Sequence, residues 1–213
     1  MERGITRFSL YTMVFLAAGV AIHSMRYAAV PAHIWLGVDT GIRSVIERVP
    51  IQALAHMIVA PFALILGPFQ FFPRIRARYP RFHRWNGRVY VAACLVAGVG
   101  GLATAPYVSG GPVAGLGFGT LAVLWIGTTV WAWRAAVARN FDLHRLLMRF
   151  SYAMTFGAVT LRLQIPVFFA MGFASYTQMS VWLAYTAWIP NVIVVAVYSL
   201  LRRPRLTVFA PAE

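Results

Sequence analysis

The sequence predicts an all-α integral membrane protein, a single domain over residues 1–213 that forms a bundle of six transmembrane helices. Hydrophobic residues make up 60% of the chain and charged residues only 11%, whereas about a quarter of the residues in an ordinary soluble protein are charged. A helix needs roughly 20 apolar residues to cross the hydrocarbon core. Apolar segments of about this length cover residues 8–27, 50–72, 89–107, 115–137, 146–172 and 181–201.

The first apolar segment follows Glu2, Arg3 and Arg7, a charge pattern that a secretory signal also shows. The apolar core of a signal peptide is usually about 7–15 residues long. Because the segment over 8–27 is longer, we expect an uncleaved transmembrane helix.

The region between the first two apolar segments is too polar to cross a membrane. Its apolar residues recur at helical spacing: Ile34, Trp35, Val38, Ile42, Val45, Ile46 and Val49. Asp39, Arg43 and Glu47 stand four residues apart on the other face. The sequence therefore predicts an amphipathic helix over residues 31–49 that lies on the outer membrane surface.

The nineteen basic residues are all arginine, and they are distributed unevenly. One side of the predicted membrane carries Arg3, Arg7, Arg74, Arg76, Arg78, Arg81, Arg84, Arg88, Arg134, Arg139, Arg145, Arg149, Arg202, Arg203 and Arg205. The other side carries Arg26, Arg43 and Arg48. Since basic loops stay on the cytoplasmic side, we expect both termini to be cytoplasmic. Arginines in short loops also favour contact with anionic lipid headgroups over nucleic-acid binding.

One arginine, Arg162, lies inside the fifth apolar segment, where residues 151–173 include no acidic residue. A guanidinium near the bilayer centre costs roughly 3 to more than 10 kcal/mol unless something compensates it. Snorkelling to the surface, backbone carbonyls, water, a carboxylate on another element or an anionic ligand would each compensate. Pro61 and Pro166 are expected to kink their helices and to free carbonyls that face Arg162 or water.

Two loop segments, residues 83–88 and 144–149, share the pattern His-Arg-x-x-x-Arg. If they belong to a parallel repeat, they bring two histidines and four arginines to one depth: His83, His144, Arg84, Arg88, Arg145 and Arg149. Positive charge that anchors the protein at the membrane edge is one interpretation. An anion site is the other, because guanidinium groups bind phosphate or carboxylate in a bidentate manner.

A second polar layer is expected nearer the outside. It would comprise His23, His56, Arg162 and Gln164. Two histidine layers favour a redox protein that binds haem b, because imidazoles on facing helices ligate iron and nearby arginines pair with propionates. His83 and His144 are the candidate iron ligands, and a bound quinone is the alternative cofactor.

The chain loosely resembles the b561-type membrane cytochromes in size and number of spans. It departs from them because their haem ligands lie within the spans, whereas His83 and His144 are expected at or beyond helix ends. The apolar segments contain no Asp or Glu and no nucleophile with an adjacent base. A hydrolase and a carboxylate-driven proton pump are therefore disfavoured.

A set of motif residues resembles the bacterial membrane-protein family catalogued as "domain of unknown function 2306". The set is His56, Pro61, Gly67-Pro68-Phe69-Gln70-Phe71, Arg76, Pro80, His83-Arg84, Gly87-Arg88, Tyr90, His144-Arg145, Met148-Arg149 and Arg162. The similarity covers roughly residues 50–200. It implies a multi-pass protein of the bacterial inner membrane and no particular activity.

Three functional hypotheses stay open at this point. The first is a redox membrane protein with haem b or quinone, and the second is a transporter or binding protein for an anionic solute or lipid. The third is an accessory subunit of a larger membrane complex, in which Arg162 would meet a carboxylate of the partner. Membrane lipids, an anionic small ligand, and a partner subunit or a second copy of the chain are the expected partners.

Overall fold

The computed structural model describes residues 2–29 and 40–201, and the side chains of residues 9–25 and 42–201. All the elements in these ranges are helices, which confirms the all-α fold class. They are α1 (Glu2–Ala29), α2 (Thr40–Arg48), α3 (Pro50–Leu66), η2 (Pro68–Phe71), α4 (Pro73–Arg78), α5 (Pro80–Thr104), η3 (Ala105–Tyr107), α6 (Gly111–Val137), α7 (Phe141–Thr155), α8 (Gly157–Ala170), α9 (Tyr176–Thr186) and α10 (Ile189–Leu201).

Five helical segments of the described chain are long and apolar enough to cross a membrane. They are Pro50–Phe71, Pro80–Tyr107, Gly111–Val137, Phe141–Ala170 and Tyr176–Leu201. α1 is a continuous helix, but its apolar part, Ser9–Met25, is shorter than these five. The structure therefore supports five of the six predicted spans, and the span over residues 8–27 stays a prediction.

The two His-Arg segments lie inside helices, so their placement in loops was wrong. α5 begins at Pro80, because a proline in the first turn lacks only an N–H that has no intrahelical partner there. α7 begins after Asn140, whose side-chain oxygen accepts a hydrogen bond from the Leu143 N–H at 3.1 Å. His83 and His144 consequently project from the first turns of α5 and α7.

The span that contains Arg162 is broken at Phe156, between α7 and α8. The Thr155 hydroxyl donates to the Ser151 carbonyl at 2.9 Å, a bond to the preceding turn that bends helices. A Cβ added to Gly157 would lie 3.2 Å from the Trp188 Cβ. Glycine therefore lets this break pack closely against the similar break between α9 and α10.

The end of α3 shows how a proline within the bundle is tolerated. Pro68 has no N–H for the Leu64 carbonyl, and the Tyr152 hydroxyl from α7 donates to this carbonyl at 3.2 Å. The Asn86 amide from α5 donates to the Leu66 carbonyl at 3.0 Å. Because an unsatisfied carbonyl in hydrocarbon costs several kcal/mol, these contacts stabilise the turn from α3 into η2.

The helices pack with apolar side chains outward and several polar side chains inward. On α5, for example, Val96 and Val99 are exposed, whereas Asn86 and Thr104 are buried. A soluble bundle has the opposite arrangement, because its exposed surface meets water. This pattern and the long apolar helices together indicate a membrane protein.

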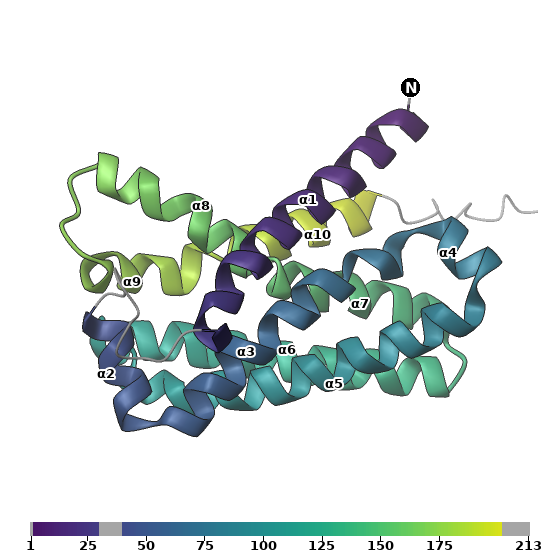
Figure 1. Cartoon of the computed structure of the whole chain (residues 1–213). Coiled ribbons are helices and arrows are strands. Elements are labelled where there is room, and N and C mark those ends of the chain that lie inside the picture. The colour runs from purple at the N-terminus through teal and green to yellow at the C-terminus, as the bar shows by residue number, and fades with distance from the viewer. Residues whose placement is uncertain (1, 30–39, 202–213) are drawn as a thin grey trace, which may run out of the picture.

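The bundle has two ends, which are visible in Figure 1. We call one the α4 end, where α4, the start of α5 and the end of α6 lie, and the other the α2 end. α1 runs obliquely across the bundle (Figure 1). The α8–α9 hairpin extends toward the α2 end. The starts of α1 and α7 and the end of α10 all point toward the α4 end.

α2 packs against the start of α3 at the α2 end. Its inward residues and their neighbours are Ile42, Val45, Ile46, Ala53, Leu54 and Met57. Arg43 and Glu47 are exposed on the other face. The earlier part of the predicted surface helix, residues 31–39, lies outside the described residues, and its place on the outer membrane surface stays a prediction.

Candidate functional site

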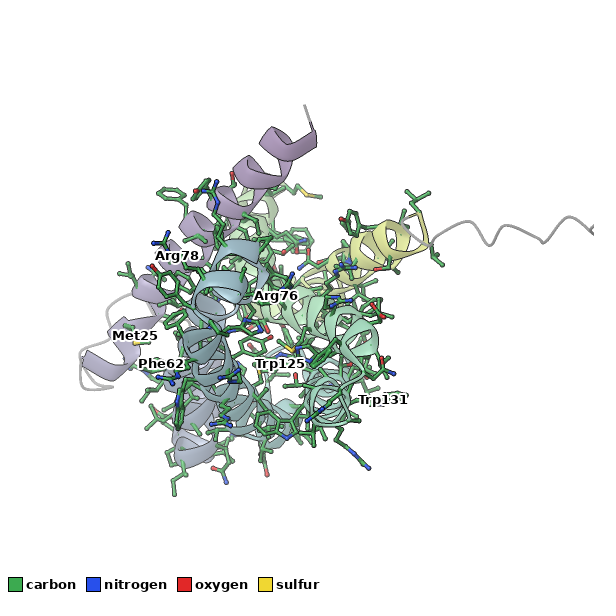
Figure 2. All side chains as sticks on the ribbon, turned by 90° about the vertical axis from the view of Figure 1, so that its right-hand side faces the viewer. Met25, Phe62, Arg76, Arg78, Trp125 and Trp131 are labelled. Atoms are coloured by element: carbon green, nitrogen blue, oxygen red, sulfur yellow. The ribbon has the colours of Figure 1, made fainter. Side chains whose placement is uncertain are left out.

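Polar side chains form three groups at different depths, and the first lies at the α4 end. We call it the inner basic cluster: Arg76 from α4, His83 and Arg84 from α5, and His144 from α7. His83 lies close enough to the other three side chains to interact with them electrostatically. In Figure 2, Arg76 lies near the middle of this end of the bundle and Arg78 lies toward its rim.

Local packing explains why α4 folds back over this end. Gln70 in η2 contacts α5 through its amide, which donates to the His83 carbonyl at 3.4 Å. A Cβ added to Gly87 would lie 3.3 Å from the Gln70 side-chain oxygen, so glycine leaves room for this contact. α4 starts two residues after η2, and its position follows from the docking of η2 on α5.

The imidazoles of the inner basic cluster differ in their hydrogen bonds. His144 donates from Nδ1 to the Ala132 carbonyl of α6 at 2.9 Å, which leaves Nε2 available. The Nδ1 of His83 is buried and has no hydrogen-bond partner within the described residues. A buried polar atom without a partner costs about 1–3 kcal/mol and calls for a bound water, ion or ligand.

The inner basic cluster has no acidic residue beside it among the described side chains. The one described carboxylate at this end is Asp142, which forms an ion pair with Arg145 at the surface. The structure thus places Arg145 in a local ion pair and brings Arg76, which sequence reasoning did not select for this site, to His83. This approach of Arg76 to His83 could not be predicted from the sequence, because it depends on how η2 and α4 fold back toward α5.

The second group is a buried hydroxyl network between α5, α6 and α7. The Ser151 hydroxyl bonds to the Tyr90 hydroxyl at 2.9 Å and to the Thr129 hydroxyl at 2.7 Å. Tyr90 also bonds to the Thr155 hydroxyl at 3.0 Å, which accepts from the Trp125 indole at 2.9 Å. These groups satisfy one another without a charged residue, so the network fits a structural role.

The third group, toward the α2 end, joins α1, α3 and α8 around Arg162. One guanidinium nitrogen donates to the Ala158 carbonyl at 3.0 Å, and another donates to the Ser24 hydroxyl of α1 at 2.9 Å. His56 is close enough to interact electrostatically with Arg162, and its Nδ1 donates to the Ala97 carbonyl of α5 at 2.8 Å. A backbone carbonyl, one of the five alternatives that the sequence left open, therefore accepts from Arg162, together with a hydroxyl from α1.

Gln164, which was also expected in the outer layer, contacts a different helix. Pro190 lacks the N–H for the Thr186 carbonyl, and the Gln164 amide donates to this carbonyl at 3.1 Å. The Thr186 hydroxyl donates to the Gln164 oxygen at 2.8 Å. Gln164 thus supports the break between α9 and α10, and His23 is exposed on α1.

Within the described residues, no three His, Cys, Asp or Glu side chains come together as a metal site would require. Of the three polar groups, the inner basic cluster is the one whose arginines and imidazoles remain suited to binding. Arginine binds phosphate and carboxylate well because its planar guanidinium presents several donors.

Residues 53–199 match the family model described as "Predicted membrane protein (DUF2306)". The chain belongs to this family. No curated protein and no solved structure matches it. The match to DUF2306 confirms the resemblance that the motif residues indicate. It includes the inner basic cluster, the hydroxyl network, His56 and Arg162, whereas Ser24 on α1 precedes the matched residues.

Proposed function

We propose that this DUF2306 protein is a membrane-embedded binding protein for an anionic group, a phosphate or a carboxylate, at the inner basic cluster. The observation that carries the proposal is the buried Nδ1 of His83, which has no partner in the described chain and lies close to Arg76, Arg84 and His144. An anion would accept the missing hydrogen bond and offset the positive charge.

The arrangement favours binding at one face of the membrane over an open channel. Tyr90, Trp125 and Tyr152 fill the middle of the bundle, and each is nearly inaccessible to solvent. The anion would therefore approach from the α4 end. We place this end in the cytoplasm, because most arginines lie there. The protein would then have six spans in the bacterial inner membrane, namely α1 and the five long apolar segments.

The proposal is tested with Arg76→Gln and a matched control, Arg78→Gln. Both arginines are exposed on α4. Arg78 differs from Arg76 in its contact, because its Cζ lies 5.9 Å from the centroid of the Tyr79 ring. The melting temperature in neutral detergent is measured with added inorganic phosphate, acetate or phosphatidic acid, and with chloride at equal ionic strength. A ligand that binds only the folded state raises the melting temperature.

We expect the wild type and Arg78→Gln to be stabilised by at least one of the three anions beyond the effect of chloride. Arg76→Gln should bind that anion at least about tenfold more weakly, since a bidentate charged contact contributes more than about 1.4 kcal/mol. Stabilisation by phosphate that Arg76→Gln weakens identifies a free anion at the cluster, and stabilisation by phosphatidic acid alone that Arg76→Gln weakens identifies a lipid headgroup there. No stabilisation of the wild type by any of the three would overturn the proposal.

A second candidate, haem b ligated by His83 and His144, is favoured by one observation. The Nδ1 of His144 donates to a backbone carbonyl, a contact that orients metal-ligating imidazoles and leaves Nε2 for the metal. The test is a reduced-minus-oxidised visible spectrum of protein purified in mild detergent from haem-replete cells. A b-type signal that His144→Ala abolishes would support this candidate, and a colourless protein would rule it out.

A further inference from the structure

A groove of about 680 Å³ lies on the outer side of α6 and the start of α7, at the α4 end. Its apolar lining is formed by Gly127, Val130, Trp131, Ala135, Ala138 and Leu143. Arg134 and Asn140 provide its polar lining. The inner basic cluster contributes none of these residues.

The groove follows α6 toward the end of this helix, and its exposed tryptophan indicates the boundary between hydrocarbon and headgroups. From Gly127 to Ala138 the helix rises roughly 16 Å, and α6 ends at Val137. Trp131 is 60% exposed, and Figure 2 shows it at the outer rim of the bundle. Indole rings favour this interfacial depth, and Arg134 stands almost one turn nearer the helix end.

The lining matches the two chemical parts of an anionic phospholipid. The surface between Gly127 and Trp131 is apolar, as an acyl chain requires. Arg134, near the end of α6, is exposed and forms no ion pair within the described chain, so its guanidinium is available to a phosphate. A solute without an acyl chain would leave the apolar part of the groove empty.

We propose that this groove binds one anionic phospholipid, with an acyl chain along Gly127, Val130 and Trp131 and the phosphate at Arg134. Gly127 has no side chain to fill this part of the groove, and a Cβ added there would point into open space with no atom within 4 Å. A larger side chain at this position would occupy the groove and leave the rest of the protein undisturbed.

The test uses Gly127→Leu with Gly19→Leu as its matched control. Gly19 is also helical, and a Cβ added there would likewise meet no atom within 4 Å, but it lies on α1. Each protein is reconstituted in nanodiscs with equal amounts of phosphatidylglycerol and phosphatidylcholine. Native mass spectrometry then measures the lipids that stay bound to the released protein, and circular dichroism checks the fold.

We expect wild type and Gly19→Leu to retain phosphatidylglycerol severalfold more often than phosphatidylcholine. Gly127→Leu should lose this bound lipid, and Arg134→Gln should keep a lipid but lose the preference for phosphatidylglycerol. Arg76→Gln should leave the preference unchanged, which separates this groove from the inner basic cluster. Equal retention of the two lipids by wild type, or unchanged phosphatidylglycerol in both Gly127→Leu and Arg134→Gln, would overturn the proposal.

Discussion

Ser151 is the centre of the buried hydroxyl network, and its replacement by alanine has a cost that the structure defines. The substitution removes the bonds to the Tyr90 hydroxyl at 2.9 Å and the Thr129 hydroxyl at 2.7 Å. Tyr90 keeps its bond to the Thr155 hydroxyl, whereas Thr129 loses its bond to Ser151 and keeps only the weaker contact between its hydroxyl and the Cys94 thiol. All these side chains are buried, so water cannot replace the lost partner.

The magnitude follows from the two bonds that are lost. Hydrogen bonds between transmembrane helices contribute about 0.6 kcal/mol on average and at most about 1.7 kcal/mol. Because Ser151→Ala removes two such bonds and leaves the buried Thr129 hydroxyl with only the weak thiol partner Cys94, we expect the free energy of unfolding to fall by about 1–3 kcal/mol. The small change in volume adds little.

The assay is unfolding by sodium dodecyl sulfate in mixed micelles, followed by circular dichroism. Thr129→Val and the double variant with Ser151→Ala complete a double-mutant cycle. Once Ser151 is alanine, the loss of the Thr129 hydroxyl should cost little, because its bond to Ser151 has already gone. Thr120→Val, on an exposed face of α6, controls for replacing a helical threonine by valine.

The reasoning would be refuted by strict additivity in this cycle or by an unchanged free energy of unfolding for Ser151→Ala. Either result would mean that the network does not hold α5, α6 and α7 together. The coupling energy between Ser151 and Thr129 should lie near 0.6–1.7 kcal/mol, the range of one bond between transmembrane helices.

Two further predictions concern single backbone positions and use the same unfolding assay. A Cβ added to Gly67 would lie 2.2 Å from the Tyr152 ring, so Gly67→Ala should destabilise the protein by about 1–3 kcal/mol, whereas Gly19→Ala should not destabilise it. Arg139 has a φ of 58°, a left-handed conformation that costs a side-chain-bearing residue about 1–2 kcal/mol. Arg139→Gly should therefore raise stability by about 1 kcal/mol, and a loss of stability would contradict this reasoning.

Much of the fold could be predicted because hydropathy and helix length belong to each segment separately. The apolar segment over 50–72 and the helix pair Pro50–Phe71 in the structure agree to within one residue at each end. The ends of other helices depend on local capping signals, which hydropathy does not contain. Pro80 and the Asn140 cap begin α5 and α7 before the apolar residues do, so the His-Arg segments became helical.

For the polar side chains, the sequence could predict the depth along the helix axis but not the neighbouring helix that each side chain faces. Arg162 and His56 were expected near each other because the rise of a helix per residue is constant, and the structure places them within electrostatic reach. Gln164, two residues after Arg162, was expected beside them but faces Thr186 on α9. Two residues along a helix rotate the side chain by about 200°, and the choice of neighbour depends on the packing of α8.

The sequence by itself determined that this is a helical membrane protein of the DUF2306 family whose arginines gather mainly at one end. Composition and apolar length are sufficient for the membrane class, because the hydrocarbon core admits few charged residues and only long apolar helices. The family assignment rests on the match over residues 53–199. The tertiary structure alone decided that Arg76 meets His83, that Ser24 accepts a bond from Arg162, and that Tyr152 satisfies a carbonyl freed by Pro68. Such contacts join helices far apart in the chain, and they depend on the order and rotation of the helices in the bundle.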